Sequence, residues 1–508
     1  MISTLSLMRL FSLPFARLKG LALALAGVAA VVLVGVPQRA AAQPTGDVTS
    51  HVTDTVAVDR VWSGHPGGFD LLVEDGHTFV AYYDAMRQLT VAHRPTGHPG
   101  WRYTKLDSYV GWDSHNYIEM ALDSEGHLHI SGNMHVDPLI YFRTTRPYDV
   151  RGLRRVETMV EPADEERATY PIFLEDKQGR LIFKYRSGES GDGNEIYNIY
   201  DTETKEWQRL LDEPLVDGEG ERNAYFEGPT LGPDGRWHLA WVWRESPDAA
   251  TNHDLSYAVS DNLTDWETST GRNLTLPITL GEAQVVDDVP VRGGMINGNT
   301  DLGFDHEGRP TITYHKFGED GNTQIYVARA EGDGEWEIYQ ISDWEDFRWD
   351  FGGGGSIKFQ VGVSGVRPAG EGRLAVDVER QGETATWLLD AETLEKGGEK
   401  PWRGASGRLR KVGGRGGKRL PRGVQTEPEM QRYEDMQMMY TRDARGTGRR
   451  ADVQYLLSWE ALGPNRDRAR AFIPPPSTLR LYRAVRDSRT SDAAGEHTNA
   501  QPRGENGE

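Results

Sequence analysis

The chain has 508 residues, a formal net charge of −20 and no cysteine. It is long enough for one large domain or two medium ones, and it can form neither disulfides nor thiolate metal sites. Its acidity disfavours nucleic acid and anionic membranes as partners. An anionic ligand would therefore require positive charge gathered in one cleft.

Residues 1–42 have the pattern of an export signal. Basic residues precede an apolar run from Leu21 to Val36, and small residues suited to cleavage follow up to Ala42. The run is short for a membrane span. We predict that this segment is removed and that the remaining chain is secreted or periplasmic, without membrane contact. An uncleaved N-terminal anchor is the alternative.

A weak repeat dominates residues 43–485. Two strands joined by a glycine-containing turn recur as LLVEDGHTFVAYY, ALDSEGHLHISG, FLEDKQGRLIFKY, LGPDGRWHLAWVW and GFDHEGRPTITYH, and the turn glycines from Gly76 to Gly372 are 50 to 73 residues apart. A third strand with alternating aromatics and a fourth with a tryptophan usually follow. Four short antiparallel strands at this period are typical of a β-propeller blade. Six copies and a C-terminal pair of strands predict an all-β, seven-bladed β-propeller, with a stacked solenoid as the alternative.

Two segments depart from the repeat. Residues 400–422 carry nine cations and no acid among many glycines, which favours a solvated insertion over a loop that grips polyanions. The polar residues 486–508 predict a disordered tail.

Candidate catalytic residues occupy equivalent positions in three successive repeats. His115 opens the first strand of the second repeat and His135 closes its second strand, while Tyr170 and Arg186 hold the same places in the third repeat and Tyr225 begins the fourth. In a propeller such strand ends meet at one end of the central channel, where ligands bind. Each residue also has a structural alternative, since the tyrosines could pack in the sheets and Arg186 could pair with an acid such as Glu189.

The block SHNYIEMALDSEGHLHISGNMHVDPLIYFR (Ser114–Arg143) resembles the signature of secreted BNR-repeat polysaccharide lyases of the ulvan lyase type. The segment SWEALGPNRDRARAFIPPPSTLRLY is similar to the closing part of that family, and the likeness spans about residues 50–485. The resemblance implies a seven-bladed propeller that cleaves sulfated, uronate-containing polysaccharide by β-elimination. The family pattern of two histidines, two tyrosines and one arginine falls on His115, His135, Tyr170, Arg186 and Tyr225.

The resemblance also bears on metal binding. Some members of the family hold a structural metal partly through cysteine, which this chain lacks. His253 and His315 remain as candidate ligands for a zinc or calcium ion. We expect no cofactor to be required for catalysis, and we expect the protein to act as a monomer on an acidic polysaccharide.

The chemistry of β-elimination suits these residue types. The enzyme must remove a proton beside a carboxylate and expel the glycosidic oxygen, so negative charge accumulates on a group that is already anionic. Arg186 stays protonated and can bind two oxygens, which suits it to neutralise that carboxylate. We expect His115 and Tyr170 to be the proton-transfer pair, with the base unresolved between them. His135 and Tyr225 would orient the substrate.

Two other classes of function remain open. A sialidase-like hydrolase would need three convergent arginines, drawn from Arg186 and the strand-end residues Arg143, Arg244 and Arg329. A non-catalytic glycan-binding propeller would need stacking tryptophans but no paired histidines.

Overall fold

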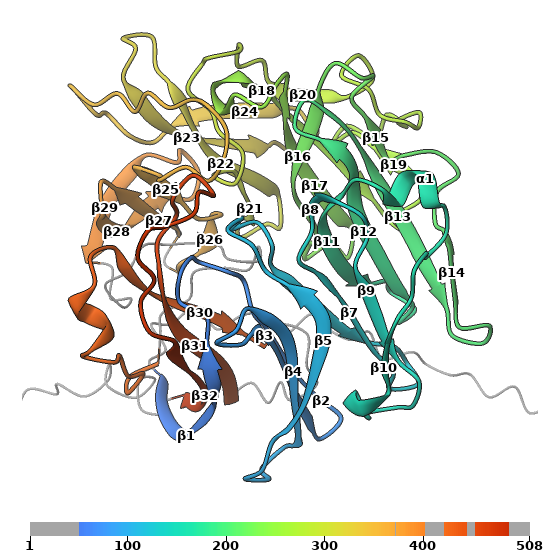
Figure 1. Cartoon of the computed structure of the whole chain (residues 1–508). Helices are drawn as coiled ribbons and strands as arrows, with labels where there is room; N and C mark the ends of the chain where they lie inside the picture. The colour runs from blue at the N-terminus through green and yellow to red at the C-terminus, as the bar shows by residue number, and fades with distance from the viewer. Residues whose placement is uncertain (1–49, 371, 402–420, 444–452, 487–508) are drawn as a thin grey trace, which may run out of the picture. The chain divides into compact units, whose positions relative to one another are not determined.

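The computed structural model describes residues 50–370, 372–401, 421–443 and 453–486. The predicted signal segment 1–42, residues 402–420 of the basic segment and residues 487–508 of the tail lie outside the described residues. The described chain is nearly all β, as predicted (Figure 1). Its helices are single turns: α1 (Pro162–Glu165), η1 (Val150–Gly152), η2 (Ala249–Thr251) and η3 (Met430–Arg432). Within these ranges no helix has the length and hydrophobicity needed to cross a membrane.

The strands form antiparallel sheets that follow one another along the chain. The first sheet contains β2 (Asp70–Glu74), β3 (His77–Tyr83), β4 (Gln88–Pro95) and β5 (Arg102–Tyr109). The second contains β6 (Ile118–Leu122), β7 (Leu128–Gly132), β9 (Tyr141–Thr144) and β10 (Leu153–Arg155). The third contains β8 (His135–Asp137), β11 (Ala168–Glu175), β12 (Leu181–Glu189), β13 (Asp192–Asp201), β14 (Glu206–Arg209) and β15 (Val216–Asp217).

The next three sheets repeat the plan, and the fourth and the sixth each have one extra strand. The fourth contains β16 (Asn223–Leu231), β17 (Trp237–Arg244), β18 (Asn252–Ser260), β19 (Trp266–Glu267) and β20 (Gln284–Asp287). The fifth contains β21 (Asp301–Phe304), β22 (Pro310–Phe317), β23 (Thr323–Ala330) and β24 (Trp336–Gln340). The sixth contains β25 (Val361–Val363), β26 (Arg367–Pro368), β27 (Arg373–Arg380), β28 (Glu383–Asp390) and β29 (Lys396–Pro401).

The last sheet joins the two ends of the described chain. Its strands are β30 (Met436–Arg442), β31 (Val453–Leu462), β32 (Ser477–Arg486) and β1 (Ser50–Val61), and β1 pairs with β32 along its length (Figure 1). The predicted C-terminal pair of strands is therefore completed by a strand from the other end of the chain. This pairing gives β32 a neighbour on both sides and makes β1 the outer strand of the sheet.

The predicted hairpins are confirmed. The turn glycines all have a positive φ between 67° and 83°, which a residue with a side chain rarely adopts: Gly76, Gly126, Gly179, Gly235, Gly308 and Gly372. Each turn lets the chain reverse between two buried strands.

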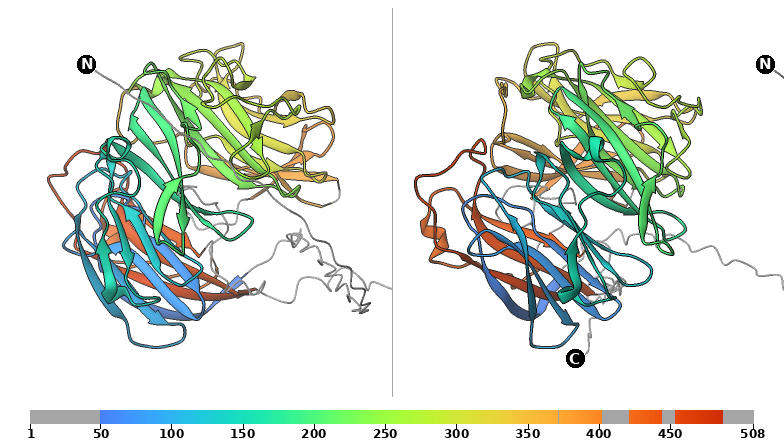
Figure 2. Two further views of the ribbon diagram at one scale, coloured as in Figure 1. Left: turned by 90° about the vertical axis from the view of Figure 1, so that its right-hand side faces the viewer. Right: turned by 45° about the vertical axis from the view of Figure 1, so that its right-hand side comes forward.

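Successive sheets pack against one another. First strands contact first strands, as in β2 with β6, β6 with β11 and β16 with β21, and β2 also contacts β30 of the last sheet. Figure 2 shows sheets of neighbouring colour, which follow one another in the chain, side by side. Because neighbouring sheets cover both faces of a sheet, its middle strands are shielded from solvent, and every residue of β17 and of β23 is buried. This packing holds the strand ends of neighbouring sheets close together, and the candidate site lies at those ends.

Candidate functional site

The five predicted residues form one continuous cluster: His115 lies in the loop before β6 rather than at the start of that strand, and the other four lie on strands of the third and fourth sheets. The ring centroids are 4.5 Å apart for His115 and His135, 5.8 Å for His135 and Tyr170, and 6.1 Å for Tyr170 and Tyr225. The guanidinium carbon of Arg186 lies 5.0 Å from the ring centroid of Tyr170 and 5.7 Å from that of Tyr225. Side chains far apart in sequence can therefore reach one small ligand together.

His135 reaches the cluster by a different route from the one predicted. The second strand of its repeat, β7, ends at Gly132, and His135 begins β8, which pairs with β11 of the third sheet. A side chain at Gly132 would collide with the backbone, since a Cβ there would lie 2.4 Å from the Tyr117 carbonyl oxygen. The chain leaves the second sheet at this point, and so His135 lies on β8, at the edge of the third sheet.

A β-bulge aims Tyr170 into the cluster. Tyr170 has a φ of 56°, and the pairing of β11 with β12 shifts between Thr169 and Ile172. A positive φ in a tyrosine is uncommon and costs free energy, and bulges of this kind redirect a side chain next to functional sites. Burial raises the pKa of the Tyr170 phenol well above its ordinary value, so this hydroxyl keeps its proton.

Arg186 is a buried cation whose charge has no partner in the described chain. Its side chain is 2% exposed, and none of its three guanidinium nitrogens has a hydrogen-bond acceptor. Glu189, the acid considered as its partner, lies near Arg167 instead. Gly193 makes room for the arginine, because a Cβ there would lie 2.9 Å from the Arg186 Cδ. A buried, unpaired guanidinium is costly, and a bound anion removes that cost.

Tyr225 lies between two arginines. Its hydroxyl is 2.7 Å from the Ser190 hydroxyl and accepts a long hydrogen bond of 3.4 Å from Arg244. Burial opposes ionisation of this phenol, but the positive charges of Arg186 and Arg244 outweigh burial and lower the pKa of Tyr225. A phenol with a lowered pKa is a stronger hydrogen-bond donor towards an anion.

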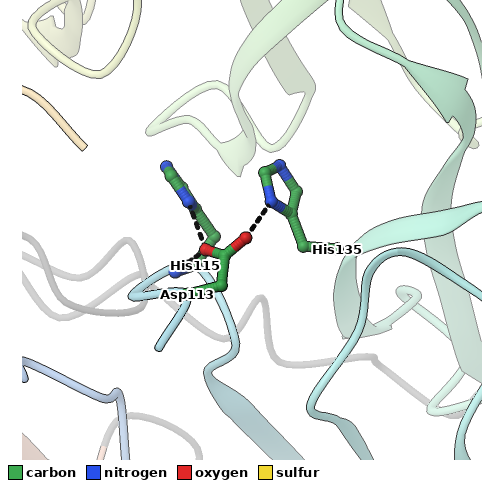
Figure 3. A group of neighbouring side chains, drawn as sticks. All are labelled: Asp113, His115 and His135. Atoms are coloured by element: carbon green, nitrogen blue, oxygen red, sulfur yellow. Dashed lines mark hydrogen bonds and ion pairs between the residues drawn. The ribbon is translucent and has the colours of Figure 1, made fainter. Parts of the chain in front are cut away.

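Asp113, which the sequence analysis did not single out, joins the two histidines (Figure 3). Its two carboxylate oxygens lie 2.7 Å from the His115 Nδ1 and 2.5 Å from the His135 Nδ1. Burial opposes ionisation of Asp113, but its hydrogen bonds with both histidines hold the pKa of the carboxyl well below its ordinary value. Each neutral ring then carries its proton on Nδ1 and leaves Nε2 available as a base or ligand. The sequence signal that could have identified Asp113 is the presence of an acid two residues before a candidate catalytic histidine.

A second acid missed by the sequence analysis fixes the loop that carries His115. The Asp467 carboxylate accepts hydrogen bonds from the Ser114 amide (3.0 Å) and hydroxyl (2.8 Å), and from the Ser356 amide (2.7 Å). The same carboxylate lies 3.7 Å from the His115 Nδ1. Asp467, which lies between β31 and β32, thus links the loop before the second sheet to the segment that precedes β25.

The two candidate metal ligands do not form a common cluster. His253 contacts Glu245 (2.7 Å) and Asp254 (2.9 Å), whereas the ring of His315 packs against Trp349. Neither belongs to a group of three or more possible ligands in the described chain, where the group that meets this criterion is Asp113, His115 and His135. The described residues therefore do not fit a metal held by His253 and His315 together.

The fold is shared with solved polysaccharide lyases. The crystal structure of polysaccharide lyase Uly1 superposes with a TM-score of 0.57 at 13% identity, over 86% of this chain and 99% of that one. An ulvan lyase of family PL25, solved bound to -[GlcA(1-4)Rha3S]-, gives a TM-score of 0.52 at 12% identity, over 84% and 95% of the two chains. No curated protein matches the sequence.

The family follows from the sequence itself. The model of the BNR repeat-containing family matches residues 77–344, which is more than half of the 508 residues. The chain belongs to this family.

Proposed function

We propose that the protein is a polysaccharide lyase that cleaves a uronate-containing acidic polysaccharide by β-elimination, on a seven-bladed propeller of which each sheet is one blade. The observation that carries this proposal is the buried, unpaired Arg186 beside Tyr170, Tyr225 and the histidine pair. The shared fold supports it, since one lyase of this fold is solved with glucuronate and a sulfated rhamnose. An ulvan-like, sulfated polymer is the substrate we favour.

Arg186 would bind the uronate carboxylate. Proton removal from the neighbouring carbon moves charge onto this carboxylate, and a guanidinium already in place stabilises the enolate-like intermediate without reorganisation. The neutral hydroxyl of Tyr225 would donate a second hydrogen bond to the same group. His135, held by Asp113, would orient the sugar.

We assign the proton-transfer roles from the raised pKa of Tyr170 and the contacts of His115. Because the pKa of Tyr170 is raised, its phenol stays protonated, and it is therefore suited to donate a proton rather than to act as the base. His115, whose Nδ1 faces Asp113, offers Nε2 as the base. Their ring centroids are 6.2 Å apart, which allows both side chains to reach one sugar. His115 would take the proton and Tyr170 would protonate the leaving oxygen, a contribution of roughly 10²–10⁴-fold.

A hydrolase of the sialidase type fits less well. Arg143 donates to Tyr200 and Lys205, and Arg329 pairs with Glu331. Both guanidinium groups are thus engaged elsewhere, and the cluster holds Arg186 and Arg244 rather than three convergent arginines.

One assay separates the three classes of function. The protein without residues 1–42 is incubated with ulvan and with other uronate polymers, and ultraviolet absorbance and reducing ends are recorded together. A lyase produces a carbon–carbon double bond conjugated with the carboxylate, which absorbs. A hydrolase releases reducing ends without this absorbance, and a binding module does neither. We further propose that residues 1–42 direct export and that the enzyme acts outside the cytoplasm as a monomer.

A further inference from the structure

A further cation, Arg87, packs against two tryptophans, one of which lies on the loop that carries Asp113 and His115. The guanidinium carbon of Arg87 is 4.2 Å from the ring centroid of Trp62 and 4.9 Å from that of Trp112. The two indoles meet edge to face, with centroids 5.5 Å apart. Trp62 is buried, whereas Arg87 and Trp112 are half-buried. Part of the Arg87 side chain and part of the Trp112 side chain are therefore accessible to solvent.

The backbone holds Arg87 in a fixed and strained position. Arg87 has a φ of 68° in the turn between β3 and β4, a conformation uncommon for residues other than glycine. The Asp84 carboxylate accepts hydrogen bonds from the Met86 and Gln88 amides, and the Val110 amide donates to the Arg87 carbonyl. Such strain occurs preferentially where a side chain must be presented to a ligand.

Arg87 has no direct acidic partner among the described residues. Within the described ranges, its side chain forms no ion pair and donates no hydrogen bond, although the chain as a whole has an excess of acids. The nearby Asp84 carboxylate is engaged with the turn amides and with Lys105, at 2.6 Å. A guanidinium that packs against rings keeps its N–H groups directed outward in its own plane, ready for an oxyanion.

The Arg87 cluster and the candidate site share one loop. Trp112 directly precedes Asp113, whose carboxylate holds His115 and His135. His65 packs against Trp112, with its ring centroid 6.5 Å from that of the indole, and its Nε2 lies 3.2 Å from the Gly111 carbonyl oxygen. Burial lowers the pKa of His65 to about 4, which leaves Arg87 as the cation of this cluster at neutral pH.

We infer that Arg87 and Trp112 form a second anion subsite, which binds a sulfate ester or a carboxylate on a sugar next to the uronate held by Arg186. The guanidinium would bind the oxyanion and the indole would contact the sugar carbons. This inference rests on the proposed function. It adds a specificity determinant for the anionic group of a neighbouring sugar.

The test compares Arg87→Gln with Arg102→Gln, which removes an exposed arginine from strand β5 of the same sheet. Affinity electrophoresis and initial rates are measured with ulvan and with chemically desulfated ulvan. Loss of one charged contact is expected to weaken binding and to raise KM by about tenfold for Arg87→Gln, with kcat nearly unchanged. A loss restricted to ulvan identifies a sulfate, and a loss on both polymers identifies a carboxylate.

Equal binding by Arg87→Gln and Arg102→Gln on both polymers would overturn the inference. If Arg87→Gln does not fold, Arg87→Lys, which keeps the charge but not the planar fork, is compared with Arg102→Lys, and equal affinities again overturn it. If no protein produces unsaturated ends, the proposed lyase activity fails, whereas the electrophoresis still decides whether Arg87 binds the polymer.

Discussion

Tyr170 and Tyr225 lie with their ring centroids 6.1 Å apart and share contact with Arg186, yet their pKa values are shifted in opposite directions. Burial raises the pKa of Tyr170, whereas the charges of Arg186 and Arg244 overcome burial at Tyr225. The same cluster therefore contains one phenol that retains its proton and another that releases it more readily. This difference separates a proton donor for the leaving group from a ligand for the carboxylate.

The first prediction concerns the alkaline limb of the pH–rate profile. Tyr225 donates a hydrogen bond only below its pKa, and as pH rises through that pKa its phenolate repels the substrate carboxylate. Because the pKa is lowered, activity should fall at a lower pH than an ordinary tyrosine would cause. Tyr225→Phe should lose activity modestly at neutral pH and abolish this limb in a plot of kcat/KM against pH. An unchanged limb would show that another group titrates there.

The second prediction concerns Arg244, whose positive charge contributes to the lowered pKa of Tyr225. Arg244→Gln removes one positive charge, so the pKa of Tyr225 should rise and the alkaline limb should move to higher pH. Arg222→Gln serves as the control, because Arg222 pairs with Glu219, Glu221 and Glu245. A limb that moves equally in both variants would mean that the effect is not local to Tyr225.

The third prediction concerns Asp113, which we assign as a positioning residue. Asp113→Asn keeps the size of the side chain, but an amide has one accepting oxygen, and its NH2 group can only donate. The variant therefore cannot accept a hydrogen bond from the Nδ1 of each histidine on a separate oxygen, as Asp113 does. We expect kcat to fall roughly 10- to 100-fold with little change in KM. Asp107→Asn, an exposed acid on β5, is the matched control. If Asp113→Asn retains the wild-type kcat, the carboxylate has no role in presenting the histidines.

The fourth prediction concerns the sheet that joins the two chain ends. Leu479 is fully buried on β32 and pairs with Asp59 of β1. Leu479→Ala should lower the free energy of unfolding by about 2–5 kcal/mol, measured by urea denaturation. Leu231→Ala removes the same atoms at a position that is 48% exposed and should change it by no more than about 0.5 kcal/mol. Equal effects would mean that β32 is not part of a packed core.

The hairpins could be predicted from the sequence because their signal is local. A strand, a glycine turn and a second strand lie within a dozen residues, and the turn at Gly126 or Gly179 requires the positive φ that glycine allows. The pairing of β1 with β32 had no such signal, because the partners lie at opposite ends of the chain. His135 was assigned to the wrong sheet for a related reason, since leaving a strand at Gly132 depends on the neighbouring backbone.

The site was partly predictable for the same physical reason. The repeat places Tyr170, Arg186 and Tyr225 on corresponding strands of the third and fourth sheets, so their convergence followed from the period, whereas His115 lies in the loop before β6 rather than at the start of that strand. Asp113 and Asp467 act through loops whose course depends on contacts between sheets, and no periodic pattern marks such residues.

The most direct test of the central claim is the rate of unsaturated-end formation by Arg186→Ala on a uronate polymer, with folding checked by thermal denaturation. The account predicts that wild-type protein generates the ultraviolet-absorbing product and that Arg186→Ala lowers its rate by roughly 10²–10³-fold, a larger loss than that of Tyr225→Phe. An Arg186→Ala variant that forms this product at the wild-type rate would contradict the claim that the buried guanidinium holds the carboxylate during β-elimination.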